Sequence, residues 1–181
     1  MAVDTAYQEA VRRIDRARQD GVTELYLSGM GLTEVPSVLG QLTGLQVLDL
    51  WRNQISSIPS VLGQLTGLQK LDLSFNQISS IPSVLGQLTG LQELKLSRNQ
   101  ISSIPSVLRQ LRRLRQLDLD SNQISSIPSV LGQLRRLEIL SLDNNPLNPQ
   151  FATAYSQGTD VLLQYLRSIA PDPARSKEAK R

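Results

Sequence analysis

The segment NQISSIPSVLGQLTGLQ occurs twice without a change, at Asn53–Gln69 and at Asn76–Gln92. Two close relatives follow, NQISSIPSVLRQLRRLR from Asn99 and NQISSIPSVLGQLRRLE from Asn122, so the copies start 23 residues apart. A repeat of this period is typical of stacked supersecondary units that bury their apolar faces only against one another. Because a stack presents one long surface, we expect a chain that holds another molecule.

Each unit places apolar residues at fixed positions, which we number from Leu45 as position 1. Leu48 and Leu50, at positions 4 and 6, alternate with polar residues, as in a strand with one buried face. The strands of successive units are expected to pair in parallel, with a right-handed return. Pro59, at position 15, fixes φ and removes a backbone donor, which suits a short turn or a short helical segment of sequence SVLGQL.

Position 9 holds an asparagine in all but the first unit. An asparagine amide can both donate to and accept from the backbone where the chain leaves the strand. Met30 takes this position in the first unit, as expected of an atypical end repeat. The predicted column is Asn53, Asn76, Asn99, Asn122 and Asn145.

The template L-x-x-L-x-L-x-x-N-x-L-x-x-L-P-x-x-L-x-x-L resembles the leucine-rich repeat pattern. It fits five full units and one partial unit within residues 22–147, and these begin at Val22, Leu45, Leu68, Leu91, Leu114 and Leu137. The resemblance implies an α/β leucine-rich repeat solenoid. Its parallel β-sheet would form the concave face of a curved stack, with short helical or irregular returns on the convex face.

Helices are expected to close both ends, because an exposed end would leave leucine faces in water. Residues 1–21 form the predicted N-terminal cap, with a helix over Thr5–Asp20, a capping box of Thr5 and Gln8, and a stop at Gly21. The side chains expected to face the first unit are Val11, Ile14 and Ala17.

Residues 148–170 form the predicted C-terminal cap, in which PQFATAYSQG and TDVLLQYLRSI are expected to be helical. The second segment has apolar residues at helical spacing, and these are Leu162, Leu163, Tyr165, Leu166 and Ile169. Residues 171–181 are polar and contain proline, which favours a linker or a disordered tail.

The units differ mainly at the strand positions that should face solvent, whereas their return segments barely change. Drift at solvated positions would explain the variation, but it does not explain why equally solvated return residues stayed the same. We therefore favour a diversified protein-binding surface on the concave face. The residues predicted to bind there are Trp51, Arg52, Lys70, Phe75, Lys95, Arg98, Asp118 and Asp120.

Trp51 and Phe75 are the strongest single candidates on that face. Strand alternation directs Trp51 outward, so we expect an exposed indole that does not enter the leucine core. An exposed tryptophan beside Arg52, with Phe75 on the next unit, has the composition of a binding hot spot. For Phe75 the alternative is that its ring shields the edge of the core.

The acidic residues Asp118, Asp120 and Asp143 lie close in the repeat register, and three carboxylates could hold a hard cation. Stacked strands provide no loop to wrap such an ion, so a solvated acidic patch is the preferred interpretation. Nothing in the pattern forms a pocket for paired acid and base catalysis. We expect no metal ion and no cofactor.

A cluster of six arginines departs from the repeat just before the fifth and sixth strands. Arginine pairs replace Thr-Gly at positions 22 and 23, a further arginine replaces a glycine and another replaces a glutamine. The interpretations are docking of an acidic partner or neighbouring domain, a phosphate or nucleic-acid footprint, and a solubilising rim. No aromatic residues interleave with the cluster, so nucleic acid is not the expected partner. The residues are Arg109, Arg112, Arg113, Arg115, Arg135 and Arg136.

The 181 residues include no cysteine and no histidine. These absences exclude thiolate zinc sites, cysteine nucleophiles and Ser-His-Asp triads, and they fit a reducing cytosol. The N-terminus has no apolar core of signal-peptide length, and no stretch is long enough to span a bilayer. We expect a cytoplasmic protein that does not bind membranes.

The flanks of the repeats resemble those of bacterial Roco proteins. The resemblance rests on AVRRIDRARQDGVTELYLSGMGLTEVP and NPLNPQFATAYSQGTDVLLQYLRS. In Roco proteins the repeats precede a Ras-like GTPase domain, and the tail PDPARSKEAKR looks like the approach to that domain. The phosphate-binding motif G-x-x-x-x-G-K-[ST] is absent from this sequence, so GTP hydrolysis cannot be carried over.

The sequence therefore predicts a non-catalytic protein-binding module of intracellular signalling that recognises a partner of unknown identity through its concave face. The alternative is a regulatory or assembly domain of a larger Roco-type GTPase, in which a Ras-like domain would be the partner. An engineered consensus scaffold would also carry copies this similar.

Overall fold

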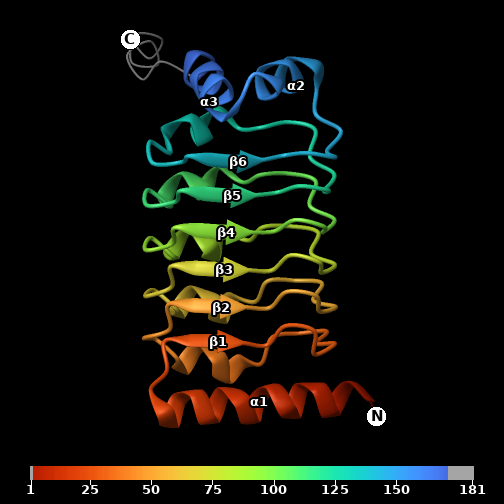
Figure 1. Ribbon diagram of the computed structural model, residues 1–181, viewed down its shortest axis with the longest axis vertical. Coiled ribbons are helices and arrows are strands. Elements are labelled where there is room, and N and C mark those ends of the chain that lie inside the picture. Colours follow the sequence, from red (N-terminus) through yellow and green to blue (C-terminus); the bar gives the residue numbers. More distant parts are fainter. Residues whose placement is uncertain (1, 171–181) are drawn as a thin grey trace, which may run out of the picture.

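The computed structural model describes residues 2–170 and the burial of side chains from residue 5 onward. Six short parallel strands lie one above another, with helix α1 closing one end and helices α2 and α3 closing the other (Figure 1). The sheet runs in chain order, and each strand pairs with the next in register. The strands are β1 Glu24–Tyr26, β2 Val47–Asp49, β3 Lys70–Asp72, β4 Glu93–Lys95, β5 Gln116–Asp118 and β6 Ile139–Ser141.

The returns between strands are 3-10 helices, which confirms the short helical segments that the sequence predicts. Each begins directly after the proline of its unit, whose extended backbone leads into the turn. The strands and these returns form the two sides of a curved leucine-rich repeat solenoid, as predicted. The returns are η1 Ser37–Gln41, η2 Ser60–Gln64, η3 Ser83–Gln87, η4 Ser106–Gln110 and η5 Ser129–Gln133.

One continuous leucine and isoleucine core runs through the stack. In the second unit, Leu48, Leu50 and Ile55 are all 0–1% exposed, and the equivalent residues of later units are equally buried. These residues alternate with half-buried or exposed neighbours along each strand, as a sheet with one covered face requires. Each unit thus buries its apolar face against its two neighbours.

The asparagine column makes the hydrogen bonds that the sequence predicts. The Oδ1 atom of Asn76 accepts from the Ile55 backbone N–H at 3.0 Å, and its Nδ2 donates to the Leu50 and Leu73 carbonyls, both at 3.0 Å. The same contacts recur in the other four asparagines, and each amide therefore joins its own unit to the preceding one. Met30 instead packs partly buried against the core.

The N-terminal cap is a longer helix than the sequence predicts. Helix α1 spans Ala2–Asp20 and so passes through Thr5 rather than beginning there. It ends at Gly21, whose φ of +62° confirms the predicted stop. Ile14 and Ala17 are buried as expected, but Val11 is only half-buried, and Ala10 takes its place on the covered face.

The C-terminal cap consists of two helices, as predicted. Helix α2 covers Pro149–Ser156, and helix α3 covers Thr159–Ser168 and packs on η5. Leu162, Leu163 and Leu166 are buried, whereas Ile169 is 44% exposed because it follows the last helical residue. The expectation that Ile169 packs inside is therefore wrong. The predicted tail, residues 171–181, lies outside the described residues.

Candidate functional site

The concave sheet face brings equivalent residues of successive units into rows. Position 3 contributes the row Glu24, Val47, Lys70, Glu93, Gln116 and Ile139, and position 5 contributes Tyr26, Asp49, Asp72, Lys95, Asp118 and Ser141. The predicted binding residues on this face therefore lie in neighbouring strands or directly after them. Within each row, neighbouring residues are separated by the strand spacing of about 4.8 Å.

Four of these residues form a contiguous cluster, which we call the aromatic–arginine patch: Trp51, Arg52, Phe75 and Arg98. The Trp51 and Phe75 rings meet edge to face, with centroids 5.5 Å apart. The Arg52 guanidinium lies 5.7 Å from the Trp51 ring, and that of Arg98 lies 4.8 Å from the Phe75 ring. Both separations lie within the range of cation–π attraction.

Arg52, Phe75 and Arg98 share a further property. They occupy the same position of three successive units, and their φ angles are +55°, +57° and +53°. A residue with a Cβ pays about 1–2 kcal/mol in this left-handed region, where glycine is the natural choice. The first unit has Gly29 at this position. Ser121 and Asn144 adopt the same conformation in the last two units, so the left-handed turn belongs to the repeat, and the second to fourth units place bulky side chains on it.

Trp51 is half-buried, which corrects the expectation of an exposed indole. Phe75 and Arg52 lie against its ring. Neither aromatic ring belongs to the leucine core, and Phe75 remains 40% exposed. The alternative that Phe75 shields the core edge therefore loses support. Ser74, on the strand end next to Trp51, is buried, and its Oγ has no hydrogen-bond partner within residues 2–170.

Lys70 and Lys95 are tied to Glu93, which lies between their strands. The ammonium of Lys95 is 2.8 Å from one Glu93 oxygen, and that of Lys70 is 3.5 Å from the other. The hydrogen bond from Lys95 lowers the pKa of Glu93 and reciprocally raises the pKa of Lys95. These two lysines therefore present a partly neutralised surface, unlike Arg52 and Arg98.

The acidic residues Asp118 and Asp120 of the last units accept hydrogen bonds from backbone N–H groups. Asp118 Oδ1 accepts from the Asp120 N–H at 3.1 Å, and Asp120 Oδ1 accepts from the Asp143 N–H at 2.7 Å. Burial raises the pKa of Asp120, as do the negative charges of Asp118 and Asp143, against the opposing hydrogen bond from Asp143. Among the described residues, no group of three candidate side chains could hold a metal ion.

Two exposed apolar residues of the concave face were not among the predicted binding residues. Tyr26 is 53% exposed on β1, and Ile139 is 49% exposed on β6. Both lie in rows that are otherwise mostly polar. This contrast is visible in the sequence and could have identified them as candidate binding residues. They extend the apolar surface beyond the aromatic–arginine patch.

The predicted arginine rim separates into two hollows. Five of its six members line a broad, open groove together with Arg167 of α3, which the sequence analysis did not include. Arg115 instead lines a smaller hollow that it shares with Arg135, Arg136, Glu138 and Asp160. Its guanidinium lies 3.9 Å from the Glu138 carboxylate. The groove residues are Arg109, Arg112, Arg113, Arg135, Arg136 and Arg167, which we call the arginine groove.

Comparison with known families settles the class of the chain. The family model described as leucine rich repeat matches residues 20–78, 66–124 and 90–147. The chain belongs to the leucine-rich repeat family. This fold is typically a non-catalytic scaffold for protein interaction.

A search of curated proteins found no match. Within residues 2–170, no helix has the length and apolar character needed to cross a membrane.

Solved leucine-rich repeat structures resemble the stack closely. An LRR protein of Leptospira interrogans is 40% identical, with a TM-score of 0.70, over 71% of this chain and 33% of that one. The ectodomain of the receptor kinase GASSHO1/SCHENGEN3 from Arabidopsis thaliana is 40% identical, with a TM-score of 0.65, over 71% of this chain and 16% of the receptor. Internalin C2 of Listeria monocytogenes is 38% identical, with a TM-score of 0.64, over 70% of this chain and 54% of the internalin.

Proposed function

We propose that this leucine-rich repeat domain binds a protein partner through its concave face, with the aromatic–arginine patch at the centre of the interface. The observation that carries the proposal is the packing of the patch, in which the Trp51 and Phe75 rings meet edge to face at 5.5 Å and each ring contacts an arginine. Tryptophan and arginine are also the residues most enriched in interface hot spots.

The similar structures support a peptide or protein as the ligand. The Arabidopsis receptor ectodomain was solved in complex with Casparian strip integrity factor 2, and a plant peptide hormone receptor of the same fold was solved in complex with RGF2. Our proposal includes a non-catalytic role in intracellular signalling and a cytoplasmic location. The absence of histidine and cysteine supports the non-catalytic role. The absence of cysteine also supports the cytoplasmic location.

A second candidate function is regulation or assembly within a larger Roco-type GTPase. The observation that favours it is the arginine groove, which lies beside α3 and apart from the concave strands. In that arrangement a Ras-like domain, in the same chain or another, would contact the groove. The flanking segments quoted above supply the resemblance on which this candidate rests.

Affinity capture with matched variants distinguishes the two candidates. Trp51→Ala combined with Arg98→Glu should weaken capture of the partner by about tenfold or more, because both changes remove hot-spot side chains. Val161→Ala, which truncates an exposed apolar residue of α3, is the control and should leave capture unchanged.

Reversal of charge at Arg112, Arg113, Arg135 and Arg136 tests the second candidate. Loss of the partner only in this variant would favour the Roco-type arrangement over concave binding.

A drop in melting temperature of many degrees for Trp51→Ala alone would show that Trp51 is structural, and would contradict the proposed function.

A further inference from the structure

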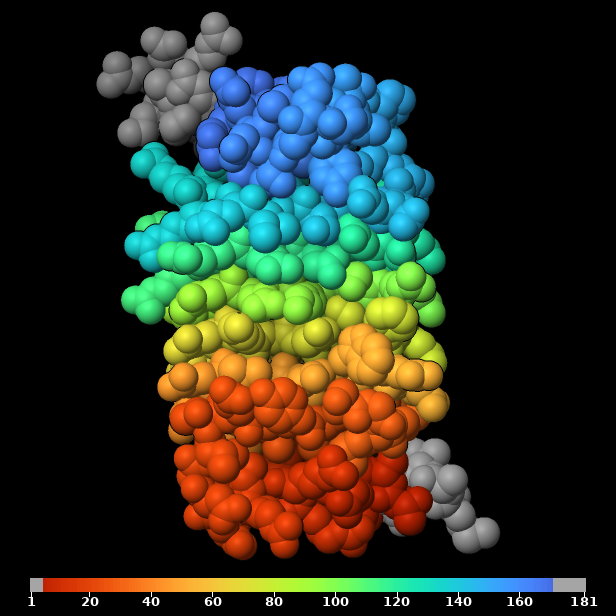
Figure 2. Space-filling model, viewed as in Figure 1, coloured from red at the N-terminus to blue at the C-terminus, as the bar shows by residue number. Residues whose placement is uncertain are grey.

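The arginine groove combines six guanidinium groups with no acidic residue in its lining. It runs along the edge of the stack at the turns that precede β5 and β6, and α3 contributes Arg167 to its lining. Side chains of these two units project from that edge in Figure 2. Because equivalent residues of neighbouring units lie about 5 Å apart, the arginine pairs repel one another unless an anion lies between them.

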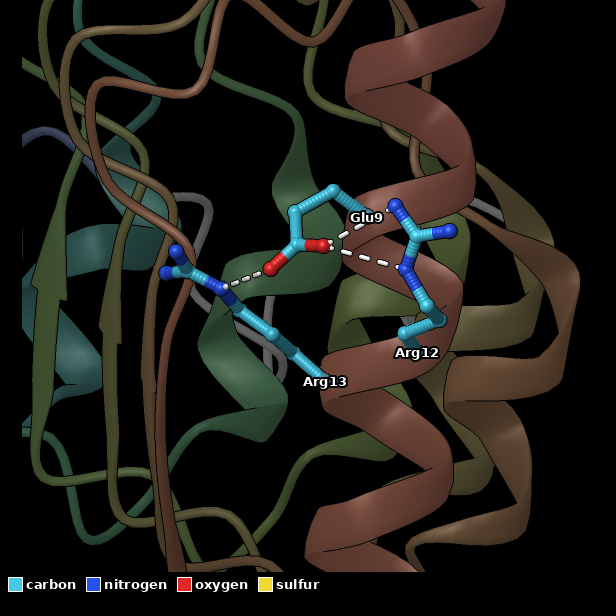
Figure 3. A network of polar contacts seen from close by, with 3 residues as sticks. All are labelled: Glu9, Arg12 and Arg13. Carbon is cyan, nitrogen blue, oxygen red and sulfur yellow. Dashed lines mark hydrogen bonds and ion pairs between the residues drawn. The ribbon is translucent and has the colours of Figure 1, made fainter.

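The groove arginines have no carboxylate partners in the part of the chain that the structure describes. Arg167 is held in place by its Nε, which donates to the Gly132 carbonyl at 2.7 Å. The arginines at the opposite end of the stack behave differently: Glu9 lies 3.1 Å from both Arg12 and Arg13 on α1 (Figure 3). Six guanidinium groups without a carboxylate partner are therefore gathered in the groove, whereas Arg12 and Arg13 of α1 are paired.

The repeat indicates that a side chain has little room at one position of this groove. The earlier units that line it have Thr66, Thr89 and Gly90 at the equivalent positions. A Cβ at Gly90 would lie 3.3 Å from the Leu68 carbonyl oxygen, closer than such atoms usually approach. Arg113 and Arg136 carry a side chain at this position, so drift is a poor explanation for them.

Arg109 provides a second example. It replaces the glycine of the other return segments, and a Cβ at the equivalent Gly86 would lie 2.4 Å from Val107 Cγ2. The neighbouring return must shift to accept a side chain there, and this shift weakens a close contact. The two departures together indicate that charge in the groove is maintained at some cost to packing.

We propose that the arginine groove binds an acidic segment of a protein partner, at a site separate from the concave face. Arginine forms paired hydrogen bonds with carboxylates, and the arginine pairs repeat along the stack, as needed to engage successive acidic side chains. The open groove does not enclose a small anion. No aromatic side chain lines it, so it lacks the stacking surfaces that single-stranded nucleic acid requires.

The test uses a short fluorescent peptide of alternating glutamate and serine, with binding measured by anisotropy at low and at physiological salt. Arg112→Thr with Arg113→Gly restores the sequence of the earlier units, so the variant should fold. We expect it to bind the peptide about tenfold more weakly. The matched control is Arg12→Gln with Arg13→Gln, which removes the same charge from α1 and should change binding by less than about twofold.

Three results would overturn the proposal. They are equal weakening by the two variants, no weakening by the groove variant, and tighter binding of heparin or duplex DNA than of the peptide at physiological salt. A melting temperature within a few degrees of the parent protein shows that the groove variant is folded. Trp51→Ala should leave peptide binding unchanged, which keeps this test independent of the proposed concave interface.

Discussion

At the scale of single residues, the asparagine column is the polar feature that recurs in every unit after the first. Each buried amide satisfies backbone groups of two units at the point where the chain leaves the strand. Removing such a side chain leaves one buried backbone N–H without a partner, and an unsatisfied group of this kind costs about 1–3 kcal/mol. The asparagines therefore connect local turn geometry to the stacking of whole units.

Asn76→Ala should lower the free energy of unfolding by about 1–3 kcal/mol, because the buried Ile55 N–H loses its partner and the Leu50 and Leu73 carbonyls each lose one of two asparagine donors. Urea denaturation measured by circular dichroism checks this value. Gln77→Ala, at the exposed neighbouring position, is the control and should change stability by less than about 0.5 kcal/mol. Similar losses in both variants would show that the column has no special role.

At the scale of elements, the return segments determine how closely units stack. Gly63 of η2 lies against the next unit, and a Cβ there would come 2.3 Å from Val84 Cγ2. Gly40 and Gly86 have equally close neighbours, so the glycine of SVLGQ is retained for space. Gly44 differs, because nothing lies within 4 Å of the Cβ that it would gain.

Gly63→Ala should destabilise the protein by about 1–3 kcal/mol, since the added methyl group forces η2 and η3 apart. Gly44→Ala is its matched control, and it should leave stability unchanged or raise it by up to about 1 kcal/mol by restricting the unfolded chain. Thermal unfolding of both variants provides the comparison. If Gly63→Ala were as stable as Gly44→Ala, close packing of the returns would not explain the glycine.

At the scale of the whole molecule, stability is expected to be a sum over units and the interfaces between them. The second and third units differ only at a few strand positions, and each contacts only its neighbours. The two helical caps cover the apolar ends of the stack, with Ile14 at one end and Leu163 at the other, both almost fully buried. A complete unit can therefore be removed without exposing core.

Deletion of residues 68–90 should give a folded protein with one cooperative transition at a melting temperature several degrees lower, because one interface is lost. Deletion of residues 68–78 breaks the register and should abolish folding. Circular dichroism and thermal melting distinguish the two. An unfolded product from the full-unit deletion would show that the units are not interchangeable.

The repeat pattern was sufficient to predict the strands, the returns, the buried leucines and the asparagine bonds. These features arise from interactions within one unit or between identical neighbours, so the 23-residue period contains the necessary information. The predicted site was recovered less completely. Trp51 and Phe75 do lie together, but Lys70 and Lys95 are paired with Glu93, and this pairing depends on which side chains adjacent strands bring into register.

The sequence by itself therefore determined the architecture and the two surfaces on which the units differ. Only the tertiary structure decided that Arg167 joins the arginine groove, that Arg115 does not, and that Ile169 stays exposed. The physical reason is that these outcomes depend on how a non-repeating cap packs on the last unit. The repeat specifies contacts between equivalent neighbours, and it carries no information about the contacts of a segment that has no equivalent.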